Sequence, residues 1–327
     1  MTLHTASGAQ PTLRVRDLEF SLGDNVRLGP INLEAAPGTT LGVVGETGSG
    51  KSLLCRALVG MLSLTGGTID AGSIKFQGEE YARADRRRWA HLRQRRVGYM
   101  PQASMAGLNP VRKVGGQLTE ILAGSRAAKV EKARLLMQQV QMRDPDQVLR
   151  SYPHELSGGM RQRVMLAFAL ASDPAIVVAD EPTTALDATV QNEVLRLIQQ
   201  VQKERDMAMV LVSHDMRVIR RVCDQVAVMY GGRIVEMGPT TTVLSTPSHP
   251  YTKALLQADP MLAQRKTMLG AIGGAPRPPA EWRDGGCVFR ERCPLATELC
   301  ASQVPELRTV REGATAACHY AEEVLAA

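Results

Sequence analysis

The chain has 327 residues, of which 44% are hydrophobic and 22% are charged, so it is long enough for one large or two ordinary domains with a sizeable core. No segment approaches the roughly 20 consecutive apolar residues of a membrane-spanning helix, and the first residues lack the basic-then-apolar pattern of a secretory signal. We therefore expect a cytosolic protein whose cysteines stay reduced. The net charge is +6, but aromatic residues make up only 4%, too few for a surface on which nucleic-acid bases stack.

Short apolar runs that fit buried strands alternate with helical stretches along most of the chain. Residues 13–20 and 31–35 alternate apolar and polar side chains, as half-buried antiparallel strands do. Three almost wholly apolar runs fit central strands of a sheet covered on both faces: LGVVG (41–45), AIVVAD (175–180) and MVLVSH (209–214). Residues 116–172 have a mostly helical pattern, and 226–238 have the pattern of a hairpin that turns at two glycines.

An arginine-rich stretch, RADRRRWAHLRQRR, carries seven arginines between Arg83 and Arg96, with Asp85 as the one opposing charge. Three interpretations of this stretch remain open. It can be a solvated helix face, a nucleic-acid patch, or a surface close to anionic lipid head groups or membrane subunits.

The apolar run LGVVG leads directly into GETGSGKS, residues 45–52, which has the spacing G-x-x-x-x-G-K-S and precedes a helical stretch. Its glycines let consecutive backbone N–H groups curl round phosphate oxygens, and the following helix points the positive end of its dipole at the same place. Lys51 can reach the β- and γ-phosphates, and the Ser52 hydroxyl can ligate Mg²⁺. The residues expected to hold ATP in this loop are Gly45, Thr47, Gly48, Ser49, Gly50, Lys51 and Ser52.

Two adjacent carboxylates, Asp180 and Glu181, stand at the end of the buried strand AIVVAD. Such a pair suits Mg²⁺ and a hydrolytic water. We expect Asp180 to hold the metal ion through its hydration shell and Glu181 to orient or deprotonate the attacking water. For this motif alone, an acidic pair that merely caps a strand would be the plain alternative.

With LSGGMRQR, residues 156–163, the ordered motifs resemble the nucleotide-binding subunit of an ABC transporter. The resemblance covers roughly residues 13–240. It implies a signature that closes over the ATP bound by an opposite subunit in a head-to-tail pair, made of Ser157, Gly158 and Gly159. The placement is physically sensible, because SGG opens a helix whose first N–H groups form a second anion site.

The same resemblance implies roles for two further side chains. Gln102, in YMPQAS, would contact Mg²⁺ and water and sense the membrane subunits, and His214, in VSHDM, would contact the γ-phosphate. Together with Glu181 they are the predicted catalytic residues. Ser52, Gln102 and Asp180 are the predicted Mg²⁺ site.

The implied fold is α/β: a P-loop ABC ATPase core with an antiparallel β subdomain and a helical subdomain, plus a cysteine-containing C-terminal extension. We place the nucleotide-binding domain at residues 13–244, with its helical insertion at about 100–172, and the extension at 245–327. The family usually stacks an aromatic residue on adenine, but that slot is Leu22 here. Phe20, on the same strand face, is the candidate substitute.

The wording LSGGM…DEPTTALD, AGLNP (106–110) and SHPYTKALL (248–256) resembles the oligopeptide, dipeptide and nickel importer branch and, within it, the D-type ATPase. The branch implies a heterodimer with an F-type ATPase, two transmembrane permease subunits and an extracytoplasmic substrate-binding protein. It also implies a peripheral position on the cytoplasmic face of the inner membrane. No nucleic acid is expected as a partner.

Four of the six cysteines follow the spacing C-x5-C-x6-C-x17-C near the end of the chain: Cys287, Cys293, Cys300 and Cys318. Disulfides do not suit a reducing compartment, and the tight C-x2–4-C pairs of structural zinc sites are absent from the sequence. Longer loops can wrap a four-cysteine cluster, and the tail resembles that of branch members that bear one. We therefore predict a 4Fe-4S cluster, with zinc or unmetallated thiols as alternatives.

The predicted function is an ATPase subunit that binds ATP and Mg²⁺ and powers a heteromeric ABC importer for peptides or a related small solute. The alternative is a soluble, non-transport ABC ATPase acting on nucleic acid or ribosomes, with the arginine-rich stretch as its footprint. Such proteins commonly carry two nucleotide domains or a long coiled insertion, and the sequence has neither.

Overall fold

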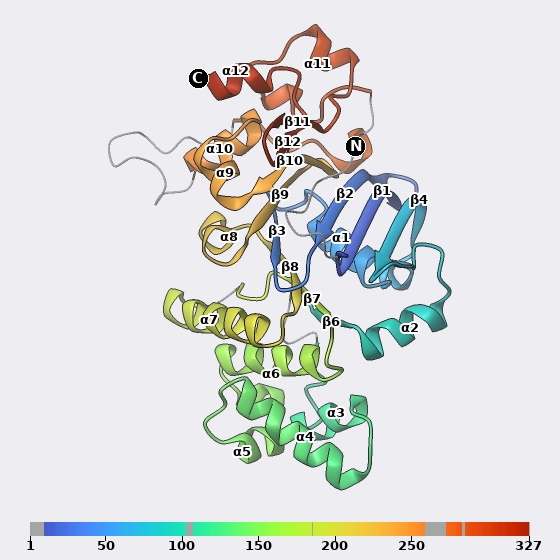
Figure 1. Ribbon diagram of the computed structural model, residues 1–327, viewed down its shortest axis with the longest axis vertical. Helices are drawn as coiled ribbons and strands as arrows, with labels where there is room; N and C mark the ends of the chain where they lie inside the picture. The colour runs from blue at the N-terminus through green and yellow to red at the C-terminus, as the bar shows by residue number, and fades with distance from the viewer. Residues whose placement is uncertain (1–9, 103–106, 185, 259–272, 283–284, 327) are drawn as a thin grey trace.

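The computed structural model describes residues 10–102, 107–184, 186–258, 273–282 and 285–326. Two sheets lying beside each other form its framework, and helices are packed round them (Figure 1).

The smaller sheet is antiparallel and has the strand order β2-β1-β4-β5. Its strands are β1 (Leu13–Leu22), β2 (Val26–Ala35), β4 (Gly67–Phe76) and β5 (Glu79–Glu80). An irregularity in the pairing of β1 after Val15 shifts the alternation of its side chains, so Val15, Leu18 and Phe20 all lie fully buried.

The larger sheet has eight strands in the order β11-β12-β10-β9-β3-β8-β7-β6. Its strands are β3 (Thr40–Val44), β6 (Val97–Met100), β7 (Ile176–Asp180), β8 (Ala208–Ser213), β9 (Gln225–Tyr230), β10 (Arg233–Pro239), β11 (Arg308–Arg311) and β12 (Ala314–Ala316). Strands β3, β8, β7 and β6 are parallel neighbours. Every residue of β3, β7 and β8 is buried, as expected of a sheet covered on both faces. The carboxyl ends of these four strands therefore lie side by side.

Helices α3, α4 and α5 gather beside α6 at the opposite end of the molecule from α11 and α12 (Figure 1). The helices are α1 (Lys51–Leu58), α2 (Arg86–Arg95), α3 (Val114–Ile121), α4 (Arg126–Gln139), α5 (Pro145–Arg150), α6 (Gly158–Leu170), α7 (Ala188–Glu204), α8 (Met216–Val222), α9 (Thr240–Ser245), α10 (Pro250–Ala258), α11 (Glu298–Ser302) and α12 (Ala321–Ala326). Short 3-10 turns cover Leu62–Thr65, Pro153–Glu155, Pro279–Glu281 and Arg290–Arg292. Within the described ranges, no helix combines the length and the apolar character needed to cross a bilayer.

The arginine-rich stretch forms α2, and part of its charge is used inside the fold. Asp85 caps the helix by accepting a hydrogen bond from the Arg88 N–H. The Arg93 guanidinium donates to the backbone oxygens of Val59 and Gly60, and Arg96 pairs with Glu79 at 2.7 Å. These contacts attach α2 to the smaller sheet and to the end of α1.

Two strands of the C-terminal extension, β12 and β11, continue the larger sheet beyond β10. β12 pairs antiparallel with β10, placing Ala316 opposite Glu236, and β11 pairs with β12. Without β12, the side of β10 that faces away from β9 would present unpaired backbone groups, which is a liability for a sheet edge. The described residues of the extension are therefore integrated with the core sheet.

A buried polar cluster fixes the start of the extension. Glu236 on β10 is fully buried and accepts hydrogen bonds from the backbone N–H groups of Ser248, at 2.6 Å, and His249, at 3.1 Å. The His249 Nδ1 atom accepts a hydrogen bond from the Tyr251 N–H at 3.0 Å. Burial raises the pKa of Glu236 and lowers the pKa of His249 to about 3, so the imidazole is neutral. The SHPY motif, residues 248–251, thus anchors α10 to the sheet.

We expect replacement of His249 by Asn to reduce the sensitivity of the fold to mild acid. The imidazole titrates near 6.5 when unfolded and about 3 when folded. Between these two pH values the unfolded chain binds a proton at His249 that the native chain does not bind. The contribution of His249 to the free energy of unfolding is therefore fully present above pH 6.5 and is lost as the pH falls. At pH 5.5 this proton costs the wild-type protein about 1.4 kcal/mol of unfolding free energy.

Urea unfolding of both proteins at pH 7.5 and 5.5 measures this effect. Glu236 is present in both, so its titration largely cancels in the comparison. Equal losses of stability in wild type and His249→Asn would show that the imidazole does not titrate in this way.

Candidate functional site

The phosphate-binding loop, residues 45–52, joins β3 to α1 and depends on its glycines. Gly48 and Gly50 have φ values of 85° and 105°, which L side chains rarely adopt. A Cβ on Gly45 would lie 2.1 Å from the backbone oxygen of Met229. Gly50 is the N-cap of α1, so the first N–H groups of that helix open into the loop.

Two buried polar groups make this loop suitable for a phosphate ligand. Lys51 is 5% exposed, and its Nζ atom donates to the backbone oxygens of Gly45, at 2.7 Å, and Glu46, at 2.8 Å. Burial lowers the pKa of Lys51, although the carboxylates of Glu181 and Asp180 act in the opposite direction. The Ser49 hydroxyl is buried and has no hydrogen-bond partner among the described residues. An orphaned hydroxyl beside a buried ammonium group fits a site that an anionic ligand completes.

The Ser52 hydroxyl donates to Asp180 Oδ1 at 3.1 Å, which joins the loop to the end of β7. Asp180 is 2% exposed, and burial raises its pKa, although the Ser52 hydrogen bond opposes the shift. Buried oxygen ligands next to a phosphate loop fit Mg²⁺, because a bound cation would offset the cost of burying the carboxylate.

Glu181 is held by side chains from three neighbouring segments. Its Oε2 atom accepts hydrogen bonds from the Thr184 hydroxyl at 2.8 Å and the Gln102 amide at 3.2 Å, and His214 Nδ1 lies 3.2 Å from it. Burial favours a raised pKa, but the Thr184 and His214 contacts and the Lys51 charge outweigh it, so the pKa of Glu181 lies below its usual value. A φ of 48° places Glu181 in the left-handed region, a strained backbone typical of functional positions.

Ser157, Gly158 and Gly159 form the start of α6. The Ser157 hydroxyl accepts a hydrogen bond from the Met160 N–H at 3.3 Å and caps the helix. A Cβ on Gly159 would lie 2.5 Å from the Val190 side chain, so glycine allows the helix to approach α7 closely. In the described part of the chain, no hydrogen bond or ion pair joins this segment to the phosphate-binding loop.

Known proteins are similar in sequence to this chain over most of its length. Residues 28–184 match the family described as ABC transporter, and residues 235–300 match the oligopeptide/dipeptide transporter C-terminal region. The probable peptide ABC transporter ATP-binding protein y4tR of Sinorhizobium fredii is 38% identical over 334 residues, which is 99% of either chain. The oligopeptide transport ATP-binding protein OppD of Escherichia coli is 39% identical over 97% of this chain and 95% of its own. The di/tripeptide transport ATP-binding protein DppF of Pseudomonas aeruginosa is 44% identical over 91% of both.

The chain belongs to the ATP-binding subunits of the peptide ABC transporters. It is therefore an ATPase that works with membrane permease subunits, as the motifs predicted, and the soluble nucleic-acid or ribosome alternative is not supported.

Solved structures agree with the predicted fold class. The dimeric, ADP- and Pi-bound ATP-binding cassette MJ0796 superposes with a TM-score of 0.61 at 22% identity, over 70% of this chain and 98% of that one. CbiO1 from Clostridium perfringens superposes with a TM-score of 0.64 at 24% identity, over 72% of this chain and 92% of that one. At such low identity these likenesses show the ABC ATPase fold alone.

The predicted 4Fe-4S cluster is wrong. Among the described residues, which include Cys287, Cys293, Cys300 and Cys318, no group of three or more His, Cys, Asp or Glu side chains is arranged to hold a metal ion. The relatives are named as peptide ATP-binding proteins and nothing more. Burial raises the pKa of Cys287 to about 11 and of Cys318 to about 12, which favours neutral thiols over the thiolates that metals need. The spacing predicted the clustering along the chain but not the protonation of the sulfurs.

The adenine-stacking substitute proposed from the sequence also fails. Phe20 is fully buried in the core between β2 and β4, so its ring has no face open to a ligand. Leu22 is partly exposed at the end of the strand, opposite Val26.

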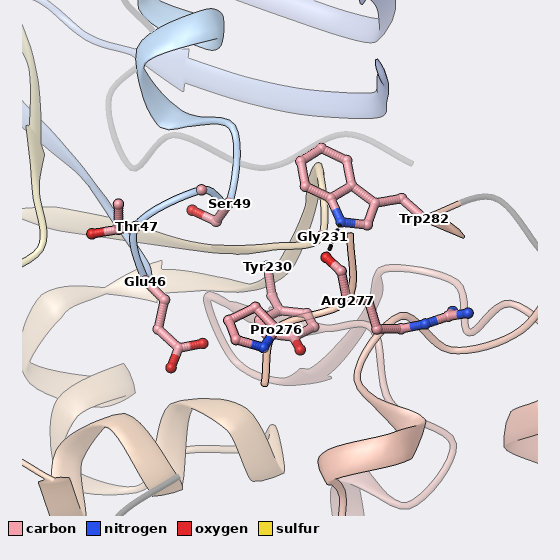
Figure 2. Close-up of a pocket in the computed structure, with 9 residues that line it drawn as sticks. Glu46, Thr47, Ser49, Tyr230, Gly231, Pro276, Arg277 and Trp282 are labelled. Carbon is pink, nitrogen blue, oxygen red and sulfur yellow. Dashed lines mark hydrogen bonds between the residues drawn. The ribbon is translucent and has the colours of Figure 1, made fainter. Parts of the chain in front are cut away.

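Sequence reasoning missed two groups of residues that contact the site. Thr184 lies in the quoted DEPTTALD wording, and its position three residues after Glu181 was the available signal. The second group comes from the extension: Pro276, Arg277 and Trp282 line a pocket together with residues of the phosphate-binding loop, although Figure 2 shows the Arg277 guanidinium pointing away from that loop. The Trp282 Nε1–H donates to the Arg277 backbone oxygen at 3.0 Å. No local pattern announces a contact between segments so far apart.

We expect Asp180→Asn to abolish the Mg²⁺ dependence of ATP binding. We expect the wild-type carboxylate to repel phosphates without a metal ion and to hold the ion through its hydration shell when it is present, so Mg²⁺ should tighten ATP binding by on the order of tenfold or more. The variant lacks both effects, and its ATP affinity should be similar with and without Mg²⁺. Isothermal titration with a chelator and with excess Mg²⁺ measures this, and equal Mg²⁺ enhancement in both proteins would remove Asp180 from the metal site.

Proposed function

We propose that this chain is the D-type ATPase of a heteromeric peptide importer and hydrolyses MgATP at the site described above. The observation that carries the proposal is the asymmetry of the Glu181 carboxylate. Three side chains hold Oε2, whereas Oε1 has no hydrogen bond to any described residue. The printed names of the relatives, which speak of peptide, oligopeptide and di/tripeptide transport, support peptides as the solute.

The chain's own groups suffice to position and activate a water molecule. Bound Mg²⁺ would supply charge neutralisation at the phosphates, with Ser52, Gln102 and Asp180 as the residues that hold it. The lowered pKa of Glu181 keeps the carboxylate ionised at neutral pH. Oε1 accepts a proton from the water as the water oxygen bonds to the γ-phosphorus, and the bond to the β-phosphate oxygen breaks with its electron pair leaving on ADP. His214, Gln102 and Thr184 hold the base in place.

The signature segment, Ser157 to Gly159, serves the ATP of a second subunit in this proposal. It opens a helix of 13 residues, so its N–H groups and the helix dipole can receive an anion, yet nothing joins it to its own loop within the described ranges. An F-type ATPase would be that second subunit. Two permeases and an extracytoplasmic binding protein would complete the importer, with this chain on the cytoplasmic face of the inner membrane. Residues 13–244, with a helical insertion at about 100–172, form the nucleotide-binding domain, and 245–327 form the extension.

A groove on the helical end of the molecule offers a surface for a permease segment. It has a volume of about 630 Å³ and lies between α3, α4 and α5. Four cations line it, namely Lys113, Arg126, Lys129 and Arg150, while the one acidic residue in the wall, Glu120, is paired with Arg112. Because the exposed charge is positive and Val130 adds apolar surface, we assign to it an acidic, partly apolar segment of a permease subunit.

We expect Glu181→Gln to bind ATP and to dimerise with its partner but to hydrolyse ATP at least about 100-fold more slowly, since the amide keeps the shape and loses the base. Equilibrium binding and steady-state phosphate release measure the two properties separately. Thr184→Ala is the matched comparison and should cause a smaller loss. Near-normal hydrolysis by Glu181→Gln would remove Glu181 from the role of base.

We expect the double substitution Arg126→Glu and Lys129→Glu to uncouple hydrolysis from transport. Folding should survive, because acidic residues suit the first turn of α4. Basal ATPase activity of the purified ATPase pair should be unchanged, whereas permease-stimulated hydrolysis and peptide uptake by reconstituted vesicles should be lost. Lys203→Glu, an exposed charge reversal on α7, is the control and should leave uptake unchanged. Normal uptake by the double variant would contradict the assignment of the groove.

A further inference from the structure

Glu46 follows the first glycine of the phosphate-binding loop. The C-terminal extension contacts both its side chain and its backbone. The Arg292 guanidinium pairs with its carboxylate at both ends, Nη1 to Oε2 at 2.6 Å and Nη2 to Oε1 at 3.0 Å. The Tyr251 hydroxyl accepts a hydrogen bond from the Glu46 backbone N–H at 2.8 Å. The proposed catalytic residues use neither contact.

Arg292 is itself held rigidly. Its side chain is 3% exposed, and its Nε atom donates to the Gly273 backbone oxygen at 2.8 Å. The guanidinium carbon lies 5.7 Å from the centre of the Tyr230 ring and 6.0 Å from that of Phe289. The bond to Glu46 is the largest cause of a raised pKa for Arg292. A bidentate arginine–carboxylate pair whose guanidinium is buried against aromatic rings fixes geometry far better than an exposed ion pair.

Tyr251 is also fixed, because it belongs to a cluster of three buried rings. The Tyr251 ring centre lies 4.6 Å from that of Tyr230 and 5.3 Å from that of Phe289. Tyr251 has no exposed surface, and the Glu236 cluster already described anchors the start of its helix, α10. Its hydroxyl therefore reaches Glu46 from a scaffold that belongs to the sheet.

Glu46 also accepts hydrogen bonds from other residues of the phosphate-binding loop. Its backbone oxygen accepts hydrogen bonds from Lys51 Nζ at 2.8 Å and from the Ser49 N–H at 3.2 Å. The next two residues, Thr47 and Gly48, are exposed, and within the described ranges no comparable hydrogen bond holds them. Fixing Glu46 thus fixes one of the two backbone oxygens that hold Lys51. Ordering the loop before the ligand binds lowers the entropy cost of binding.

We propose that Arg292 and Tyr251 are positioning residues of the ATP site, and that the C-terminal extension sets nucleotide affinity by holding Glu46 and preorganising the phosphate-binding loop. The inference rests on the proposed function, because it concerns the same ATP site. A purely structural role, in which the Arg292 pair only fastens the extension to the core, predicts a different set of results.

The test compares Arg292→Gln with the control Arg308→Gln in the full-length protein. Arg308 lies in the same extension and forms a bidentate pair with Glu322, but this pair lies on the exposed surface. Losing a charged hydrogen-bond pair that orders the loop should weaken MgATP binding and raise KM on the order of tenfold, with kcat at saturation retained. In the absence of nucleotide, hydrogen exchange of residues 45–51 should accelerate in Arg292→Gln and stay unchanged in Arg308→Gln.

Tyr251→Phe keeps the inference testable if Arg292→Gln does not fold, since it removes the hydroxyl and preserves the ring packing. It should weaken MgATP binding several-fold and accelerate exchange at the same residues. Adding Arg292→Gln to a Glu46→Gln variant should cost little further affinity, because the pair is already broken.

The inference would be overturned if Arg292→Gln and Tyr251→Phe changed neither the MgATP affinity nor the hydrogen exchange of residues 45–51, even with a lowered melting temperature. The two residues would then serve only to attach the extension to the core. Failure of the proposed function is a separate result: wild-type protein would not bind MgATP, or Glu181→Gln would hydrolyse it normally.

Discussion

The candidate ATP site depends on one geometric constraint, the side-by-side parallel pairing of β3, β8, β7 and β6. Each strand delivers one element of the site at its carboxyl end: the phosphate loop after β3, His214 after β8, Glu181 after β7 and Gln102 after β6. In a sheet of this kind, residues far apart in the sequence converge only because the strands share an edge. The hydrogen bonds from Gln102 and Thr184 to Glu181, and the His214 contact, record that convergence.

This constraint explains why residues that the structure brings together could be singled out from the sequence. Each strand is a short apolar run, and the functional group follows it immediately, so a local pattern marks both the element and its active end. Glycine spacing marks the loop in the same way, because φ values such as those of Gly48 and Gly50 demand that residue type. The family resemblance rests on motifs of this short range, and it implied the antiparallel and helical subdomains.

The features that the sequence did not predict depend on the surroundings of each side chain in the fold rather than on the order of residues along the chain. Phe20 has the right type and strand face for stacking, but the shifted alternation of β1 buries it. The cysteine spacing places four thiols near one another along the chain, yet burial determines that those of Cys287 and Cys318 stay protonated. The contact of Arg292 with Glu46 spans 246 residues, and neither residue carries a local sign of it. Long-range polar contacts of this kind become visible only once the chain is folded.

The extension and the loop are thermodynamically linked if Glu46 is held as proposed, since coupling between two sites is reciprocal. Any ligand that is bound more tightly with Glu46 in place must stabilise the Arg292 and Tyr251 contacts by the same free energy. Because β12 completes the sheet at β10 and Glu236 anchors α10, the extension cannot move away as a unit without breaking buried hydrogen bonds. A partner that contacts the extension can therefore change the conformation of the phosphate-binding loop through the Arg292 and Tyr251 contacts. Nucleotide binding at the loop acts on the extension through the same contacts.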